Sequence, residues 1–163
     1  MAVLSIRLFP DPILRKPARL VAPNEPIAGF LGDLIETLCA QPSGIGIAAP
    51  QVGEGRRIIV VDVSPRDPHK KREILINPVL VSREGEAMSR EGCMSLPDYT
   101  ADVMRFAKVT VRWHDEKGKT KTRGFSGIEA ICLQHEMDHL EGRLIIDRVG
   151  CLKTDVIPRK RRI

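Results

Sequence analysis

Residues 134–139 read Gln-His-Glu-Met-Asp-His, which places two histidines four positions apart and a glutamate directly after the first. On a helix, residues at positions i and i+4 lie one above the other on the same face. The side chains of His135 and His139 can therefore reach one metal ion, and Glu136 is placed to move a proton to or from water there. The pattern predicts a metal site on a helix.

The residues around this motif predict a buried helix over 128–141. Gly127 and Gly142 mark its ends. Apolar side chains recur at helical spacing and cover more than half of the helix circumference. They form two stripes: Ile128, Ile131 and Cys132 with the two histidines, and Ala130, Leu133, Met137 and Leu140. Buried histidines without a function would need costly polar partners, which favours metal binding over a chance occurrence of the motif.

Length and composition indicate one domain spanning residues 1–163. The chain is 42% hydrophobic and 29% charged, which is ordinary for a soluble globular protein with a real core. No apolar run approaches the roughly 20 residues of a membrane helix, and the first residues lack the apolar stretch of a secretory signal. Because the four cysteines show no close pairing pattern, we expect free thiols and a cytoplasmic protein without a membrane partner.

The net charge of +5 comes from short basic clusters. We interpret them as solvated surface and a short basic C-terminal tail from about residue 152, with weak attraction to an RNA-rich particle as the alternative. No stacking aromatic residues accompany the clusters, so we expect no sequence-specific binding of nucleic acid.

The rest of the chain predicts mainly strands. Asp11-Pro12 can open a short helix through Arg19, which Pro17 would limit, and residues 27–39 have the spacing of an amphipathic helix. The predicted strands are 45–49, 57–63, 73–81, 107–114, 120–125 and 143–146, and Pro78 indicates an edge or a bulge. Strand runs followed by a helix are typical of an α+β fold, here with antiparallel sheets packed around the helix over 128–141.

A catalytic metal site of this kind needs a third protein ligand. No histidine follows His139, and Asp147 and Asp155 are weak candidates. Cys93 is the best candidate because it stands in a glycine turn within Glu91-Gly-Cys-Met-Ser95. A thiolate would bind the ion strongly and lower its net charge.

Residues 44–51 read Gly-Ile-Gly-Ile-Ala-Ala-Pro-Gln. The two glycines allow another backbone to approach closely, although an edge strand packed with small residues would look the same. The amide of Gln51 could donate a hydrogen bond to a developing oxyanion.

Together, these three stretches resemble the motifs of peptide deformylases, metal hydrolases that remove the formyl group from new bacterial proteins. Residues 44–51, 91–95 and 134–142 match G-x-G-Φ-A-A-x-Q, E-G-C-Φ-S and Q-H-E-x-D-H-L-x-G in order, where Φ is usually leucine. The likeness covers nearly the whole chain except the tail. It implies formylmethionyl nascent peptides as substrates, formate as product and a bacterial-type cytoplasm. The family's C-terminal helix, used in some bacteria for ribosome docking, is short or absent here, so a transient association with ribosomes would depend on the basic tail as a weak replacement.

The resemblance also implies the chemistry of the site. Cys93, His135 and His139 would hold one divalent ion, Fe2+ in the native enzyme, with Zn2+, Ni2+ or Co2+ as substitutes. Glu136 would act as general base and then as general acid.

Further residues take their roles from the same resemblance. The side chain of Gln51 and the backbone N–H of Met94 would stabilise the oxyanion. The residues expected to bind the substrate are Ile45, Gly46, Ile128, Ile131 and Cys132. The residues expected to orient the metal ligands are Glu91, Gln134 and Asp138, with Arg105 paired to Glu91.

The chain departs from the family pattern at a few positions. Ile47 and Met94 replace the usual leucines, and Thr100 stands where some members carry an arginine near the substrate. Two alternatives are a metallopeptidase with the same H-E-x-x-H motif and a catalytically inactive relative that binds metal or the ribosome. The missing downstream ligand argues against the first, and the complete set of catalytic positions argues against the second.

Overall fold

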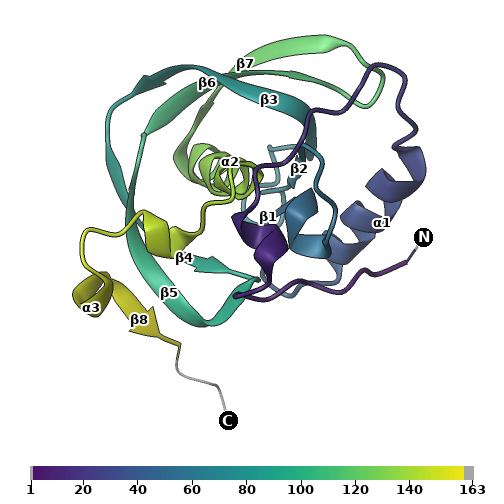
Figure 1. Cartoon of the computed structure of the whole chain (residues 1–163). Helices are drawn as coiled ribbons and strands as arrows, with labels where there is room; N and C mark the ends of the chain where they lie inside the picture. Colours follow the sequence, from purple (N-terminus) through teal and green to yellow (C-terminus); the bar gives the residue numbers. More distant parts are fainter. Residues whose placement is uncertain (1, 160–163) are drawn as a thin grey trace.

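The computed structural model describes residues 2–159, and two antiparallel sheets surround its central helix α2 (Gly127–Leu140) (Figure 1). This arrangement confirms the predicted α+β fold, and the helix begins and ends one residue from the predicted bounds. Gly142 follows the helix with a left-handed φ of 69°. A Cβ atom there would lie 2.6 Å from the carbonyl oxygen of Arg15, so a glycine is needed at this close approach.

The larger sheet has the strand order β1-β2-β3-β6-β7. Its strands are β1 (Gly46–Ala48), β2 (Ile58–Val61), β3 (Glu73–Glu84), β6 (Lys108–His114) and β7 (Thr120–Ser126). The pairing register shifts between Ile76 and Val79, which confirms the bulge predicted at Pro78. The alternative of an edge strand is wrong, because β3 lies between β2 and β6.

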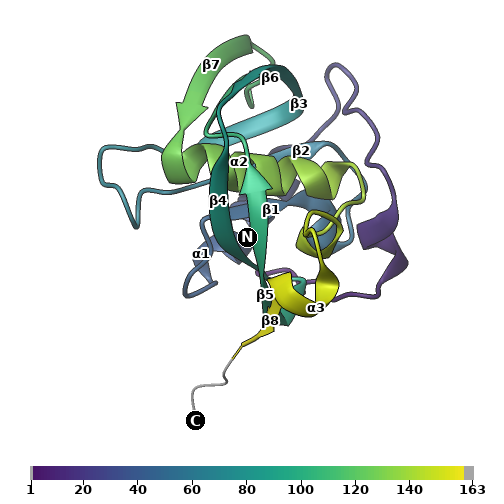
Figure 2. The same ribbon diagram turned by 90° about the vertical axis from the view of Figure 1, so that its left-hand side faces the viewer.

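The smaller sheet contains β4 (Ala87–Cys93), β5 (Leu96–Arg105) and β8 (Val156–Pro158), in the order β4-β5-β8. The sequence pattern predicts no strand over residues 87–105. Where we expected a basic tail from about residue 152, helix α3 (Leu152–Asp155) leads into β8, which pairs with β5 (Figure 2). The end of that expected tail, residues 160–163, lies outside the described residues.

The N-terminal helices match the sequence in part. The predicted short helix is the 3-10 turn η1 (Pro12–Arg15), which is opened by the side chain of Asp11 accepting from the backbone of Ile13. It ends well before Arg19 because Lys16 is extended ahead of Pro17. The amphipathic helix is α1 (Ala28–Cys39), as predicted.

Two further 3-10 turns complete the fold. Turn η2 (Ala49–Val52) follows β1, and turn η3 (Ile145–Asp147) occupies the segment predicted as strand 143–146. That strand prediction is wrong. The carboxylate of Asp147 accepts a hydrogen bond from the backbone N–H of Leu144 at 2.7 Å, which closes a turn in place of a strand ladder.

Helix α2 has two different sides. Its residues Ala130, Leu133 and Leu140 pack into an apolar core with β2, β3 and β6. Its other side faces β4 and β5, where its partners are charged side chains. The helix therefore carries its polar residues to the junction of the two sheets. No helix within residues 2–159 is long and apolar enough to span a bilayer.

Candidate active site

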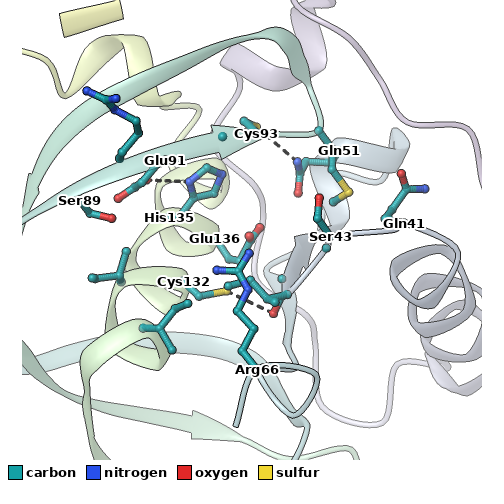
Figure 3. A pocket seen from close by; sticks show the side chains of 18 of the residues that line it. Gln41, Ser43, Gln51, Arg66, Ser89, Glu91, Cys93, Cys132, His135 and Glu136 are labelled. Atoms are coloured by element: carbon teal, nitrogen blue, oxygen red, sulfur yellow. Dashed lines mark hydrogen bonds and ion pairs between the residues drawn. The ribbon is translucent and has the colours of Figure 1, made fainter. Parts of the chain in front are cut away.

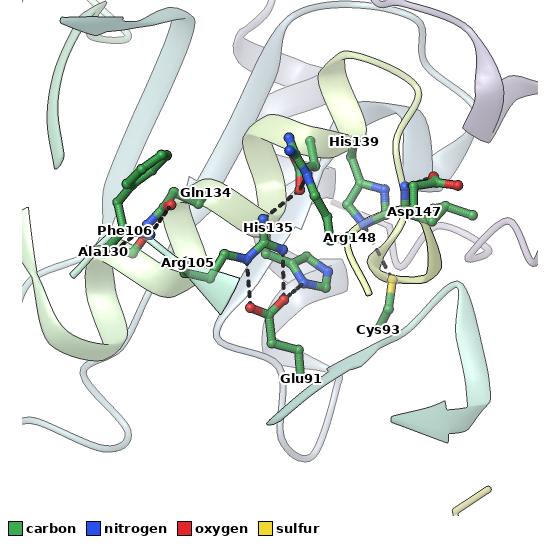
Figure 4. Close-up of polar contacts among 12 residues, drawn as sticks. Glu91, Cys93, Arg105, Phe106, Ala130, Gln134, His135, His139, Asp147 and Arg148 are labelled. Carbon is green, nitrogen blue, oxygen red and sulfur yellow. Dashed lines mark hydrogen bonds and ion pairs between the residues drawn. The ribbon is translucent and has the colours of Figure 1, made fainter. Parts of the chain in front are cut away.

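Three predicted ligands converge beside helix α2. One ligand atom each from Cys93, His135 and His139 lies within 4.8 Å of the others, and the Cys93 sulfur is 3.3 Å from Nε2 of His139. Helix α2 supplies both histidines, whose rings meet edge to face with centroids 5.1 Å apart, and the end of β4 supplies the cysteine (Figure 4). Each of these residues is less than a tenth exposed.

This donor set fits a divalent transition metal. One thiolate with two imidazoles suits iron, zinc and their neighbours, and three protein ligands leave a coordination position free. Burial works to raise the pKa of Cys93, but the adjacent His139 and His135 outweigh it and hold that pKa well below its ordinary value. The thiolate, which is the form that binds metal, is thereby favoured.

The alternative carboxylate ligands are engaged elsewhere. Asp147 pairs with Arg15 and accepts from the backbone of Leu144. Asp155 accepts from the backbone N–H of Cys151 at 2.8 Å, within the C-terminal segment. Neither residue belongs to the group of Cys93, His135 and His139, whose ligand atoms lie within 4.8 Å of one another.

A buried arginine joins the strands of the smaller sheet to helix α2. Nε and Nη2 of Arg105 donate to the two carboxylate oxygens of Glu91 at 2.7 and 2.8 Å, which is the pairing we expected. Its Nη1 donates to Asp138 at 2.6 Å. Glu91 also bonds Nδ1 of His135 at 2.9 Å, which fixes the ring so that Nε2 is left for a metal.

The charge of Glu91 is secured by the same contacts. Burial works to raise its pKa, but Arg105 and His135 outweigh burial and bring the pKa to about 2. The carboxylate therefore stays ionised at neutral pH and keeps accepting from the ring of His135.

Asp138 and Gln134 act at a greater distance from the ligands. Asp138 accepts from Nε and Nη2 of Arg148 at 3.0 and 2.5 Å, in addition to its bond with Arg105. Gln134 accepts from the backbone N–H of Phe106 at 3.0 Å and donates to its carbonyl oxygen at 2.9 Å. Both residues fix the position of helix α2, and Gln134 does so without touching a ligand side chain.

Glu136 is buried and faces the space beside the ligands. Its Oε2 has no hydrogen-bond partner among residues 2–159, and a buried carboxylate oxygen of this kind needs an explanation. Burial raises its pKa to about 7, against the lowering effect of His135 and His139. A Cβ atom on Gly46 would lie 2.6 Å from Oε1 of Glu136 and 2.5 Å from the sulfur of Cys132, so only glycine leaves this carboxylate room.

Gln51, in η2, presents its amide beside the ligands. Its Oε1 accepts from the backbone of Ala48 at 2.9 Å, which turns Nε2 toward the sulfur of Cys93 at 3.7 Å and Oγ of Ser95 at 3.3 Å. Met94 follows Cys93 in the turn after β4 and lines the same cavity. Ser95 is buried here and ends the second motif, but it was not among the residues predicted for the site.

A cavity of about 680 Å³ opens onto these groups (Figure 3). All of the residues expected to bind the substrate line it: Ile45, Gly46, Ile128, Ile131 and Cys132. The thiol of Cys132 donates to the carbonyl oxygen of Ile45 at 3.3 Å, which ties helix α2 to the segment before β1. The cavity is large enough to enclose a short peptide end. Its lining also includes Arg66 and Arg159, which sequence analysis did not single out.

The chain is similar to known proteins over almost its full length. A family model described as polypeptide deformylase matches residues 3–155. The peptide deformylase of Thermodesulfovibrio yellowstonii is 42% identical over 161 residues, which cover 98% of this chain and 97% of that protein. The peptide deformylase of Syntrophobacter fumaroxidans is 44% identical over 161 residues, covering 98% and 94%.

Solved structures of peptide deformylases are also similar to this chain. A peptide deformylase from Legionella pneumophila superposes with a TM-score of 0.86 at 37% identity, covering 93% of this chain and 89% of that one. A peptide deformylase from Synechococcus elongatus in complex with actinonin superposes with a TM-score of 0.85 at 36% identity, covering 92% and 82%.

Proposed function

The chain belongs to the polypeptide deformylase family, and from that membership and the geometry of the cavity we propose that it hydrolyses the N-formyl group of peptides that begin with formylmethionine. The observation that carries the proposal is the convergence of Cys93, His135 and His139 beside the unpartnered carboxylate of Glu136. The products are formate and a peptide with a free amino terminus.

In this proposal the substrate binds as an added strand. Its backbone pairs with Ile45 and Gly46, where β1 borders the cavity. The methionine side chain contacts Ile128, Ile131 and Cys132 on helix α2. These contacts hold the formyl group over Glu136.

The catalytic step uses residues from each part of the site. Cys93, His135 and His139 would hold one divalent ion, which supplies Lewis-acid chemistry when bound by acidifying water and polarising the formyl oxygen. Glu136 accepts the proton of the attacking water and then donates it to the leaving nitrogen as the carbon–nitrogen bond breaks.

The oxyanion of the tetrahedral intermediate receives hydrogen bonds from the protein. Nε2 of Gln51 is one donor, and its direction is set by the bond from Ala48 to Oε1 of the same amide. The backbone N–H of Met94 is the other proposed donor. Donors that are oriented before the reaction stabilise the developing charge without further rearrangement.

The test is formate release from formyl-Met-Ala-Ser, with acetyl-Met-Ala-Ser as the control. We expect formate only from the formyl peptide and no cleavage between residues. Cleavage of the peptide chain would support the metallopeptidase alternative. Metal binding without formate release would support the inactive relative.

Native enzyme is expected to contain Fe2+ and to lose activity in air, whereas a Zn2+ form is air-stable. The iron preference comes from the family, and the donor set also accepts Zn2+, Ni2+ and Co2+. Loss in air follows because a thiolate beside redox-active iron is open to oxidation. Formate release and metal content should be followed over time, in air and under anaerobic conditions, for both forms. Equal and air-stable activity of the two forms would contradict the assignment of iron.

The proposed setting is the bacterial cytoplasm, with nascent formylmethionyl peptides as substrates. A net charge of +5 supports a transient, salt-sensitive association with the ribosome. The basic clusters carry no stacking aromatic residues, so we expect no sequence-specific RNA binding. Sedimentation with ribosomes at low salt, lost as the salt is raised, is the matching observation. Binding that is independent of salt would contradict it.

A further inference from the structure

Arg159 reaches the active-site cavity from the C-terminal end of the smaller sheet. Its backbone N–H donates to the carbonyl oxygen of Asp98 at 2.7 Å, and its side chain lines the cavity. A Cβ atom on Gly92 would overlap the guanidinium nitrogen of Arg159. The guanidinium therefore lies directly over the backbone of Gly92, the residue before the predicted ligand Cys93.

The sheet explains how a C-terminal residue arrives there. Gly92 of β4 is paired with Thr100 of β5, and Thr100 is paired with Ile157 of β8. Directly paired residues of antiparallel strands lie on the same face, so these three form a line across the sheet. Arg159 stands two residues beyond Ile157. Strand β8 thus delivers its side chain to the cavity wall, and Figure 2 shows β8 lying beside β5.

The charge of Arg159 is not compensated within the described chain. Arg159 forms no ion pair with a carboxylate of residues 2–159. Arg66, a second exposed arginine that lines the cavity, forms none either. Arg90, which also lines the cavity, is bound to Asp102 by two hydrogen bonds of 2.8 Å. Two carboxylates line the cavity: Glu91 is bound by Arg105, and Glu136 forms no ion pair with Arg159 or Arg66 among residues 2–159.

A guanidinium that has no carboxylate partner within residues 2–159, at the entrance of a peptide site, favours negatively charged ligands. It presents a planar fork of donors that matches a carboxylate, and a second uncompensated arginine adds to the same positive potential. Gly46 of β1 and Gly92, which the Arg159 side chain covers, line the same cavity, so the guanidinium faces the space that a peptide paired with β1 would enter.

We propose that Arg159 is a specificity-determining residue that binds an acidic side chain in the two residues after formylmethionine. The proposal rests on the proposed function, because it takes the cavity as the site of formyl peptides. It assigns to the C-terminal strand a role in choosing substrates.

The test compares kcat/KM for amidated peptides formyl-Met-X-Ala and formyl-Met-Ala-X, in which X is Glu, Gln or Lys. The amide removes the terminal carboxylate, so X carries the only variable charge. Wild type is expected to prefer Glu over Gln by about twofold to fivefold at one of the positions, the range of an exposed ion pair. Lys should be disfavoured, and raised salt should weaken both effects.

Arg159→Gln should abolish the preference for Glu, and Arg159→Lys should keep part of it. Arg112→Gln is the matched control, because Arg112 is an exposed arginine on β6 outside the cavity lining. It should retain the full preference. An unchanged Glu-to-Gln ratio in Arg159→Gln, or an equal loss of rate on all peptides, would overturn the proposal.

A binding experiment tests the role of Arg159 independently of catalysis. Calorimetry would measure the affinity of wild type and Arg159→Gln for the amidated product peptides Met-Glu-Ala, Met-Gln-Ala, Met-Ala-Glu and Met-Ala-Gln. Absence of formate release from every peptide would refute only the proposed function. A binding preference for Glu that disappears in Arg159→Gln would still support the role of Arg159. The same preference in both proteins, or none in wild type, would contradict it.

Discussion

Glu136→Gln is expected to lose nearly all formate release while keeping its fold and its metal. Glutamine is almost the same size, and Oε2 of Glu136 has no hydrogen-bond partner among residues 2–159 to lose. What disappears is the group that takes a proton from water and returns it to the leaving nitrogen. Loss of general acid–base catalysis typically lowers a rate by about 10²–10⁴, and the high end or beyond applies because one residue serves both steps.

Formate release should be measured for wild type and variant at equal metal content. Glu141→Gln is the matched control, since it makes the same chemical change at an exposed residue just after helix α2, where Glu141 pairs with Arg57. Its rate should remain within about twofold of wild type, as for most surface substitutions. A metal-loaded Glu136→Gln protein with a rate near that of wild type would exclude Glu136 as the base.

Cys93→Ala is expected to lose most of its bound metal, and activity with it. Two neutral imidazoles remain, and the charged ligand that binds most strongly is gone. The loss of affinity should exceed the roughly 10–100-fold typical of residues that only orient a ligand. The fold should persist, because the bonds from Arg105 to Glu91 and Asp138 do not involve the cysteine sulfur.

Metal content after gel filtration into metal-free buffer, measured by elemental analysis, is the test for Cys93→Ala. Cys151→Ala is the control, because Cys151 is exposed and lies outside the converging group. It should bind as much metal as wild type. Near-stoichiometric metal in Cys93→Ala would show that the third ligand is another residue.

Hydrophobic periodicity was enough to predict the central helix and the strands of the larger sheet. Those elements bury apolar side chains at the spacing of their secondary structure, as in Ile58–Val61 and along β6. The same rule missed β4 and β5. Their buried positions include Glu91 and Arg105, which compensate each other inside the protein, so the strands do not alternate as apolar and polar residues.

Other elements depend on contacts that leave no local pattern. Strand β8 is only three residues long and contains a proline, and it exists through pairing with Tyr99–Ala101, far away in the sequence. The apolar run Leu144–Ile146 looked like a strand, but the side chain of Asp147 closes it into a turn. In the same way, only the folded sheet brings Arg159 to the cavity.

The predicted ligands were accessible from sequence to different degrees. Helical spacing alone places His135 and His139 together, because both lie on one helix. No spacing rule links Cys93 to them across more than forty residues; its glycine turn and the lack of a histidine after His139 made it the best candidate, and the family resemblance then implied the same ligand. Ser95 beside Gln51 became visible only from the hydrogen bond between the two side chains.

The contacts of Arg105 allow this chain to fold before it binds its ion. Arg105 joins β4 to helix α2 through Glu91 and Asp138, and none of these three side chains is a proposed metal ligand. Glu91 in turn bonds Nδ1 of His135, which leaves Nε2 of that ring for the ion. An apoprotein built this way keeps its ligands assembled, so an arriving ion has little chain entropy to overcome. We therefore expect that one divalent ion can be exchanged for another in the folded molecule, so that the supply of metals decides which ion fills the proposed site.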